Sequence, residues 1–135
     1  MLQNNIIKVA KETISNEARA IEELINLLDQ DFTAAVEHIY NAKGRVIITG
    51  IGKSAIIATK IVATLNSTGT PAIFMHAADA IHGDLGTIQE DDVVICISKS
   101  GNTPEIKVLV PLIKNFKNTL IAITGNKDSF LGKQS

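Results

Sequence analysis

The sequence predicts an α/β fold, a doubly wound three-layer sandwich with helices on both faces of a parallel sheet. Two observations favour it. From residue 45 onward, short apolar runs alternate with helical patterns, the order typical of a parallel sheet with crossover helices. The apolar runs are continuous rather than alternating, as in strands buried on both faces. The 135 residues are enough for one domain with a substantial core.

Two helices are expected before the alternating part. From Asn4 to about Asp29, apolar residues recur at steps of three and four with no Pro or Gly, which predicts a long amphipathic helix. We expect it to pack on its own sheet and on a partner subunit; an ordinary covering helix is the alternative. A second helix is expected from Asp31, as its N-cap, to Asn41, with Gly44 as its C-terminal signal. Residues 1–44 thus form an N-terminal helical region, and 45–135 form the core.

Within the core, strands are expected at residues 45–49, 71–75, 92–97 and 119–124. The helix expected at 54–67 is rich in Ala and Ile, which predicts burial on more than one side. Another helix should start at Thr103, a favourable N-cap, with Pro104 in the first position. Asp128 or Ser129 is expected to open a last one. Because ligands of such sheets bind beyond the carboxyl ends of the strands, functional residues should follow each strand.

Composition argues against several classes of function. The net charge is −1 and there is no Trp, so neither a basic field nor base-stacking platforms for nucleic acid are expected. The single cysteine, Cys96, falls in an apolar strand and is expected to be a packed thiol. No signal-peptide pattern or membrane-length apolar run is present, so we expect a cytoplasmic protein without a membrane partner.

The turn after the third strand carries the clearest functional signal. It contains Ser98, Ser100, Gly101, Asn102 and Thr103, directly before a helix. Free N–H groups at a helix start and several hydroxyls predict a socket for a dianionic phosphate, with glycine allowing close approach. Such a socket needs no metal or other cofactor. The alternative for each residue alone is an ordinary turn or cap.

The turn after the first strand holds Gly50, Gly52, Lys53 and Ser54. It fits the loose dinucleotide fingerprint, but the second strand ends without the acid that would bind a ribose, and the first Walker A glycine is missing. What remains is a glycine turn that brings one ammonium to a helix start, where a cation opposes the macrodipole. We therefore expect Lys53 to stabilise an oxyanion; a solvated lysine is the alternative.

The segment after the second strand holds His76, Asp79, His82 and Asp84. These spacings match no standard zinc pattern, so no metal site is expected, and an Asp–His hydrogen-bonded unit explains them equally well. His82 is the better candidate for acid–base chemistry. His76 is either a site residue or a structural strand cap, and Asp84 is a possible site residue.

Four runs together resemble the sugar isomerase (SIS) domain, and more narrowly the D-arabinose-5-phosphate isomerases. They are Gly50–Ser54, Ser67–Pro71, His82–Gly86 and Ser98–Gly101, followed by Glu105. The resemblance implies a flavodoxin-like phosphosugar-binding core at 45–135. It also implies interconversion of D-ribulose 5-phosphate and D-arabinose 5-phosphate, which supplies 3-deoxy-D-manno-octulosonate for lipopolysaccharide. Lys53, His82 and Glu105 match positions that the family is thought to use in catalysis.

The chemistry of such an isomerase assigns roles to these residues. A base moves a proton between C1 and C2 through a cis-enediol while the phosphate fixes the far end. Ser98, Ser100 and Thr103 are expected to hold the phosphate, and Lys53 to stabilise the enediolate. Glu105 is a candidate base and His82 a candidate proton shuttle, although the sequence does not decide which is base and which is acid.

Two departures accompany the resemblance. Many family members carry a pair of CBS domains, which are not present here, and the isomerase domain continues with a further strand and helices, so we interpret the chain as a fragment. A non-catalytic phosphosugar sensor and an isomerase of another sugar phosphate, such as a hexulose 6-phosphate, remain alternatives. The resemblance also implies self-association, expected through residues 4–29 and the sheet edge, with His38 or His76 as candidate donors to a neighbour's site.

Overall fold

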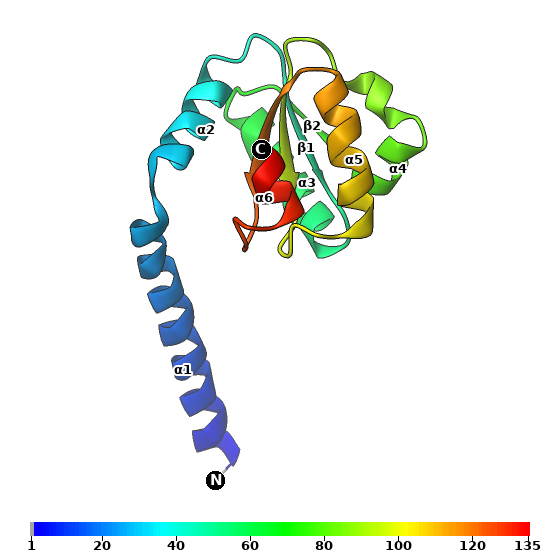
Figure 1. Ribbon diagram of the computed structural model, residues 1–135. Coiled ribbons are helices and arrows are strands. Elements are labelled where there is room, and N and C mark those ends of the chain that lie inside the picture. Colours follow the sequence, from blue (N-terminus) through cyan, green and yellow to red (C-terminus); the bar gives the residue numbers. More distant parts are fainter. Residues whose placement is uncertain (1) are drawn as a thin grey trace. The chain divides into compact units, whose positions relative to one another are not determined.

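The computed structural model describes residues 2–135, with side chains from Asn5 onward (Figure 1). The chain divides into two compact units, Met1–Val36 and Glu37–Ser135. The second unit contains the sheet, and each unit is described by itself.

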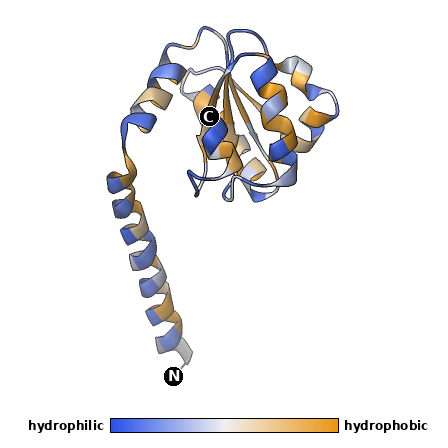
Figure 2. Cartoon of the chain, viewed as in Figure 1, coloured by the Kyte–Doolittle hydropathy of each residue, from blue (hydrophilic) through white to orange (hydrophobic). Residues whose placement is uncertain are grey.

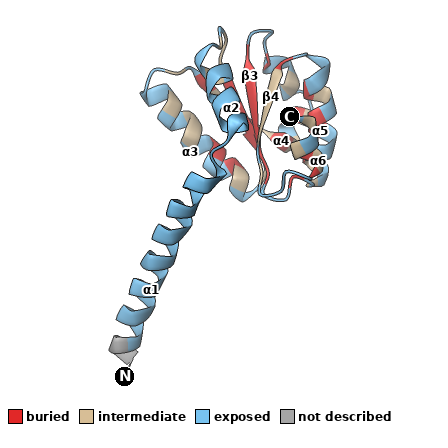
Figure 3. Ribbon diagram, turned by 60° about the vertical axis from the view of Figure 1, so that its left-hand side comes forward, coloured by how far each residue is buried: buried red, intermediate tan, exposed pale blue. Residues whose placement is uncertain are grey.

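The first unit begins with α1 (Leu2–Glu23), which continues into a short 3₁₀ turn, η1 (Leu24–Leu27). The prediction of one helix to Asp29 is therefore wrong at its end, because Leu28 adopts an extended conformation, with φ −74° and ψ 109°. An apolar stripe runs along α1 (Figure 2), and its side chains are exposed to solvent (Figure 3).

Helix α2 (Gln30–Tyr40) starts two residues after Leu28. The carboxylate of Asp29 accepts hydrogen bonds from the N–H groups of Asp31 and Phe32, at 3.0 and 3.2 Å. Asp29, rather than the predicted Asp31, therefore caps this helix.

The second unit is built on a four-stranded parallel sheet in the order β2-β1-β3-β4. The strands are β1 (Val46–Gly50), β2 (Ala72–His76), β3 (Val93–Ile97) and β4 (Thr119–Ile123), each within two residues of the sequence prediction at either end. They pair in register, so that Gly50 lies opposite both His76 and Ile97, and Ile97 opposite Ile123. All four carboxyl ends therefore form one edge of the sheet.

Helices cover both faces of this sheet, as predicted (Figure 1). On one face, α3 (Lys53–Ser67) packs on Ile48 and Ile95 through Ala58, Ile61 and Leu65. On the other face lie α4 (Ala77–Ile81), α5 (Pro104–Asn115) and α6 (Phe130–Gln134). Their cluster includes Ile106, Leu109 and Ile113, packed with strand residues Val94 and Cys96. Alternation along each strand thus sends successive side chains to opposite cores.

Three details of the second unit differ from expectation. Helix α3 is not buried on more than one side of this chain, because Ile56 and Ile57 are 70% and 55% exposed. Gly44 does not end α2. It approaches the carbonyl of Asp91 so closely that a Cβ would lie 2.5 Å from that carbonyl group. The sequence predicts no helix between β2 and β3, whereas the structure has α4 and the 3₁₀ turn η2 (Asp84–Thr87) there.

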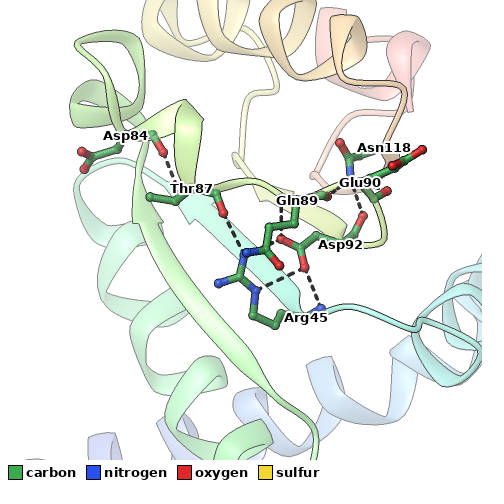
Figure 4. A network of polar contacts seen from close by, with 7 residues as sticks. All are labelled: Arg45, Asp84, Thr87, Gln89, Glu90, Asp92 and Asn118. Atoms are coloured by element: carbon green, nitrogen blue, oxygen red, sulfur yellow. Dashed lines mark hydrogen bonds and ion pairs between the residues drawn. The ribbon is translucent and has the colours of Figure 1, made fainter.

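A partly buried ion pair joins the strands at the opposite, amino edge (Figure 4). The Arg45 guanidinium donates to both carboxylate oxygens of Asp92, at 3.2 and 2.7 Å, and to the carbonyl of Thr87 at 2.8 Å. The Asn118 amide donates to the carbonyls of Gln89 and Asp92, at 2.8 and 2.7 Å. These hydrogen bonds therefore connect the starts of β1, β3 and β4, at the end of the sheet opposite the carboxyl edge.

Candidate functional site

The connections of the sheet create a topological switch point at the carboxyl edge. From β1 the chain passes through α3 to β2 on one side, and from β3 it passes through α5 to β4 on the other side. Helices α3 and α5 lie on opposite faces of the sheet, so the turns after the neighbouring strands β1 and β3 start side by side and lead to opposite faces. This is the place where open parallel sheets bind ligands. Both turns that the sequence marks as functional lie here.

The turn after β1 is a tight glycine turn that opens α3. Gly52 precedes the helix with φ 58° and ψ −127°, a conformation that residues with a Cβ rarely adopt. A Cβ on Gly50 would lie 3.2 Å from the carbonyl oxygen of Ile97, so glycine lets β1 and β3 run close together. Lys53, the first residue of α3, is exposed, and Ser54 beside it is half-buried.

In the turn after β3, one serine hydroxyl stabilises the turn and another is exposed to solvent. The Ser98 hydroxyl, only 3% of whose residue surface is exposed, accepts the N–H of Gly101 at 3.2 Å and pairs with the Thr103 hydroxyl at 3.1 Å. The Ser100 hydroxyl is on an exposed residue and accepts the N–H of Asn102 at 3.2 Å, leaving its own proton to donate. Ser98 therefore shapes the turn, and Ser100 faces solvent.

Gly101 is required by the fold of this turn as well as by its φ of +64°. A Cβ there would collide with the hydroxyl of Ser129 and lie 2.5 Å from its Cβ. From the sequence, this glycine is explained by the close approach of a ligand. The structure adds a second explanation, which is the close approach of Ser129 at the start of α6.

The N-terminus of α5 is left open. Thr103 is at the N-cap as predicted, but its side chain makes no capping hydrogen bond because its hydroxyl pairs with Ser98. In the part of the chain that the structure describes, the N–H groups of Glu105 and Ile106 have no hydrogen-bond acceptor. Free N–H groups and the positive end of a helix dipole attract an anion. The half-buried Glu105 carboxylate lies in the same first turn.

His76 ends β2 on the other side of β1, opposite Gly50. Its Nδ1 is buried and lacks a hydrogen-bond partner, and Oδ2 of Asp79 is 3.8 Å away. The imidazole lies edge-on to the Phe74 ring, with centroids 6.2 Å apart. His76 is therefore at the carboxyl edge and packed against its own strand.

His82 and Asp84 lie further along the chain. Helix α4 leads away from the carboxyl edge, and His82 follows its last residue as an exposed C-cap. Asp84 opens η2, whose last residue, Thr87, is bonded to Arg45 at the amino edge (Figure 4). In the described part of the chain, no hydrogen bond or ion pair joins either residue to Lys53 or Ser100.

Comparison with known proteins decides the family. The SIS domain family matches residues 38–135. The chain belongs to the SIS domain family. It is 48% identical over 134 residues to arabinose 5-phosphate isomerase KdsD of Pseudomonas aeruginosa. It is 44% identical over 131 residues to a Haemophilus influenzae protein named as a probable arabinose 5-phosphate isomerase. These alignments cover 98% and 97% of this chain but only 41% and 39% of the relatives, so this SIS-domain chain spans about two fifths of their length.

Solved structures agree with this assignment. An Escherichia coli CFT073 protein, solved in complex with arabinose 5-phosphate, matches the SIS-domain chain with a TM-score of 0.91 and 41% identity, covering 97% of this chain and 70% of that one. The Vibrio vulnificus NanR protein matches with a TM-score of 0.82 over 94% of this chain and 48% of that one, but at 19% identity it shares the fold alone. The resemblance drawn from the sequence is therefore confirmed at the level of the family and its relatives.

The SIS fold gathers most of the predicted site residues at one edge. They come from the starts of α3 and α5 and the turns before them: Gly50, Gly52, Lys53, Ser54, Ser98, Ser100, Gly101, Asn102, Thr103 and Glu105. His76 lies at the same edge, one strand away. Sequence reasoning missed the segment after β4, which contacts the Ser98–Thr103 turn through Gly125, Ser129 and Leu131. The Ser129 helix-start signal at the end of the chain was a clue to it.

Three further observations concern metal ligands, the cysteine and membrane-spanning helices of this SIS domain. No group of three or more His, Cys, Asp or Glu side chains in residues 2–135 is placed to hold a metal ion. Cys96 is buried, and its burial raises the pKa of the thiol to about 12, so it is not a nucleophile at neutral pH. Across the described part of the chain, no helix is both long and apolar enough to span a bilayer.

Proposed function

We propose that the protein containing this chain is an aldose–ketose isomerase that interconverts D-ribulose 5-phosphate and D-arabinose 5-phosphate. The observation that carries the proposal is the switch point, where two helix N-termini and the Ser98–Thr103 turn meet beside an exposed lysine. The identity of 44–48% to named arabinose 5-phosphate isomerases supports the choice of substrate. The product would supply 3-deoxy-D-manno-octulosonate for lipopolysaccharide, in the cytoplasm.

Substrate binding is assigned to the turn after β3. The phosphate accepts hydrogen bonds from the Ser100 hydroxyl and from the free N–H groups at the start of α5. Thr103 can still donate its proton to the phosphate when the Ser98 hydroxyl donates to the Thr103 oxygen, since either hydroxyl can be the donor in their pair. Binding the phosphate far from C1 and C2 orients the reacting carbons.

The proton transfer is assigned to the residues that flank this phosphate site. Glu105, in the first turn of α5, takes the proton from one carbon and returns it to the other, so that no net charge is gained. The Lys53 ammonium, at the start of α3, stabilises the negative oxygen of the enediolate. No metal or organic cofactor enters this scheme.

Self-association belongs to the same proposal. His82 follows the last residue of α4, and its assigned role as proton shuttle is proposed to be exercised at the site of a second copy. The exposed apolar side chains of α1 and of the α3 pair Ile56 and Ile57 provide surface for such a contact. His38 and His76 stay alternative donors.

A coupled assay of the longer natural protein tests the function. Ribulose 5-phosphate and fructose 6-phosphate are offered separately, and we expect turnover of the first only. Turnover of fructose 6-phosphate instead would reassign the substrate. Tight binding of sugar phosphate with no turnover of either would favour the phosphosugar sensor, whose fold is shared by the NanR protein.

A further inference from the structure

We infer that Asn102 is a positioning residue: its carboxamide fastens the Ser98–Thr103 turn to the first residue of α6 and does not itself bind the ligand. The inference rests on the proposed function, because it concerns how the turn is held for a sugar phosphate. It replaces the expectation that the Asn102 side chain contacts the phosphate.

Both ends of the carboxamide are engaged within the protein. Its Oδ1 accepts the N–H of Phe130 at 3.1 Å, across 28 residues of chain. Its Nδ2 donates to the carbonyl oxygen of Ser100 at 3.2 Å. One proton of Nδ2 is therefore all that the side chain can still donate to a phosphate oxygen.

The contact to Phe130 is part of a longer seam between two segments. The N–H of Gly125 donates to the Lys99 carbonyl at 3.0 Å, and the N–H of Leu131 donates to the Gly101 carbonyl at 3.0 Å. Ser129, 2% exposed, packs against Gly101. Three successive carbonyl groups of the turn therefore accept hydrogen bonds. Those of Lys99 and Gly101 are bonded by the segment after β4, and that of Ser100 is bonded by the Asn102 side chain.

Fixing the direction of a carbonyl group also fixes the direction of the N–H group in the same peptide unit. A peptide unit is planar, and its C=O and the next N–H point in opposite directions. The Lys99 carbonyl is directed at Gly125, so the N–H of Ser100 is directed away from the β4–α6 segment. That N–H has no acceptor within the described chain and is free for an anion. Asn102 closes this arrangement by holding the Ser100 carbonyl.

A proline substitution isolates the Asn102–Phe130 hydrogen bond. Phe130→Pro deletes the donor N–H, while proline is well accommodated at the first position of a helix. The preceding Ser129 has φ −66° and ψ 166°, the region that a residue before proline prefers. Phe130→Ala is the matched control, because it also removes the ring but keeps the N–H.

The affinity of the 135-residue chain and its variants for D-arabinose 5-phosphate is measured by calorimetry. We expect Asn102→Ala to weaken binding about tenfold, and Phe130→Pro to bind about tenfold more weakly than Phe130→Ala. In an Asn102→Ala background, Phe130→Pro and Phe130→Ala should bind equally, because the contact that distinguishes these two variants is already lost. Equal affinity of the proline and alanine variants, with a loss only in Asn102→Ala, would make Asn102 a direct ligand and overturn the inference.

Amide hydrogen exchange tests the tether without any ligand. The Phe130 N–H should exchange faster in Asn102→Ala and stay protected in Asn102→Asp, which keeps the accepting oxygen. Unchanged exchange in Asn102→Ala would overturn the inference, even if binding were altered. A chain that protects this N–H but binds no sugar phosphate would instead count against the proposed function. If Asn102→Ala does not fold, Asn102→Asp and the Phe130 pair carry the test.

Discussion

Three hydroxyls of one turn differ in what surrounds them. Ser98 is buried, and its oxygen is used by the Gly101 N–H and the Thr103 hydroxyl. Ser100 is exposed, and only its acceptor capacity is used. Although both residues are serines, the buried Ser98 hydroxyl stabilises the turn, whereas the exposed Ser100 hydroxyl is able to contact a ligand.

The first prediction at this scale concerns Ser100→Ala. It should weaken D-arabinose 5-phosphate binding about 10- to 100-fold, since a hydrogen bond to a charged group contributes about 1.5–3 kcal/mol. Calorimetry measures the affinity, and circular dichroism checks that the fold is kept. Ser67→Ala, which removes an exposed hydroxyl at the far end of α3, serves as control and should bind normally. Equal affinity of wild type and Ser100→Ala would remove Ser100 from the site.

The second prediction concerns Lys53→Ala in the longer natural protein. Turnover should fall by about 100-fold or more, on the order of the loss of one oxyanion-stabilising group, while the Michaelis constant changes little. Steady-state kinetics separates the two constants. Lys60→Ala, two turns further along α3, is the matched control. If only the Michaelis constant rose, Lys53 would bind the substrate and have no special role in the transition state.

At the scale of elements, the amino and carboxyl edges of the sheet have different tasks. At the amino edge, Arg45, Asp92 and Asn118 join the starts of β1, β3 and β4 through buried and partly buried hydrogen bonds. At the carboxyl edge, the N-termini of α3 and α5 keep free N–H groups. Stability is supplied at one edge, so the other can leave polar groups unpaired for a ligand.

The third prediction follows from Asp92. Its burial opposes ionisation, but the hydrogen bonds from the Arg45 side chain and from the N–H groups of Gln89 and Arg45 outweigh this and hold its pKa below the ordinary value of 3.8. A carboxyl with a lowered folded pKa contributes stability above its unfolded pKa, and this is lost as pH falls through the folded pKa. The denaturant midpoint should therefore fall with pH below about 4.

Variants of the same pair check this reasoning. Asp92→Asn should destabilise the chain by about 3 kcal/mol at neutral pH, because it leaves the Arg45 charge without its partner. Its stability should also depend less on pH below about 4 than that of the wild type. Glu90→Gln, an exposed neighbour, is the control and should behave as wild type. An equally steep pH dependence in Asp92→Asn would mean that other carboxyl groups dominate acid unfolding.

At the scale of the molecule, exposed apolar surface predicts assembly. Ile14 and Ile21 lie one heptad apart, and so on the same face of α1, and are 67% and 66% exposed. The fourth prediction is that the chain forms at least a dimer, and that Ile14→Glu with Ile21→Glu weakens it, because burying two carboxylates is unfavourable. Light scattering at micromolar concentration gives the mass.

A control on the same helix makes that test specific. Glu12→Gln with Arg19→Gln changes exposed charged residues of α1 and should leave the mass unchanged. A folded wild-type chain with a clean monomer mass would contradict both the role of α1 in assembly and a site shared between copies.

The sequence by itself determined the elements and their chemistry. Apolar runs and periodicity located the four strands, α3 and α5, and Thr103 with Pro104 located the start of α5, because these signals depend on neighbours a few residues apart. The same local signals predicted the hydroxyl-rich turn and the lysine at the start of α3. They separated the first two helices but misplaced the boundary and the cap between them by a few residues, since the extended Leu28 and the cap on Asp29 leave the apolar rhythm almost unchanged.

The tertiary structure alone decided how these parts meet. Pairing β1 with β3 rather than only with β2 created the switch point and put the two functional turns side by side. It also joined Arg45 to Asp92, 47 residues apart, and Asn102 to Phe130, 28 residues apart. Whether a serine is buried, or an amide is already bonded, depends on such distant partners. No local pattern encodes them, because strand order is set by packing of the whole sheet and not by the residues of any one segment.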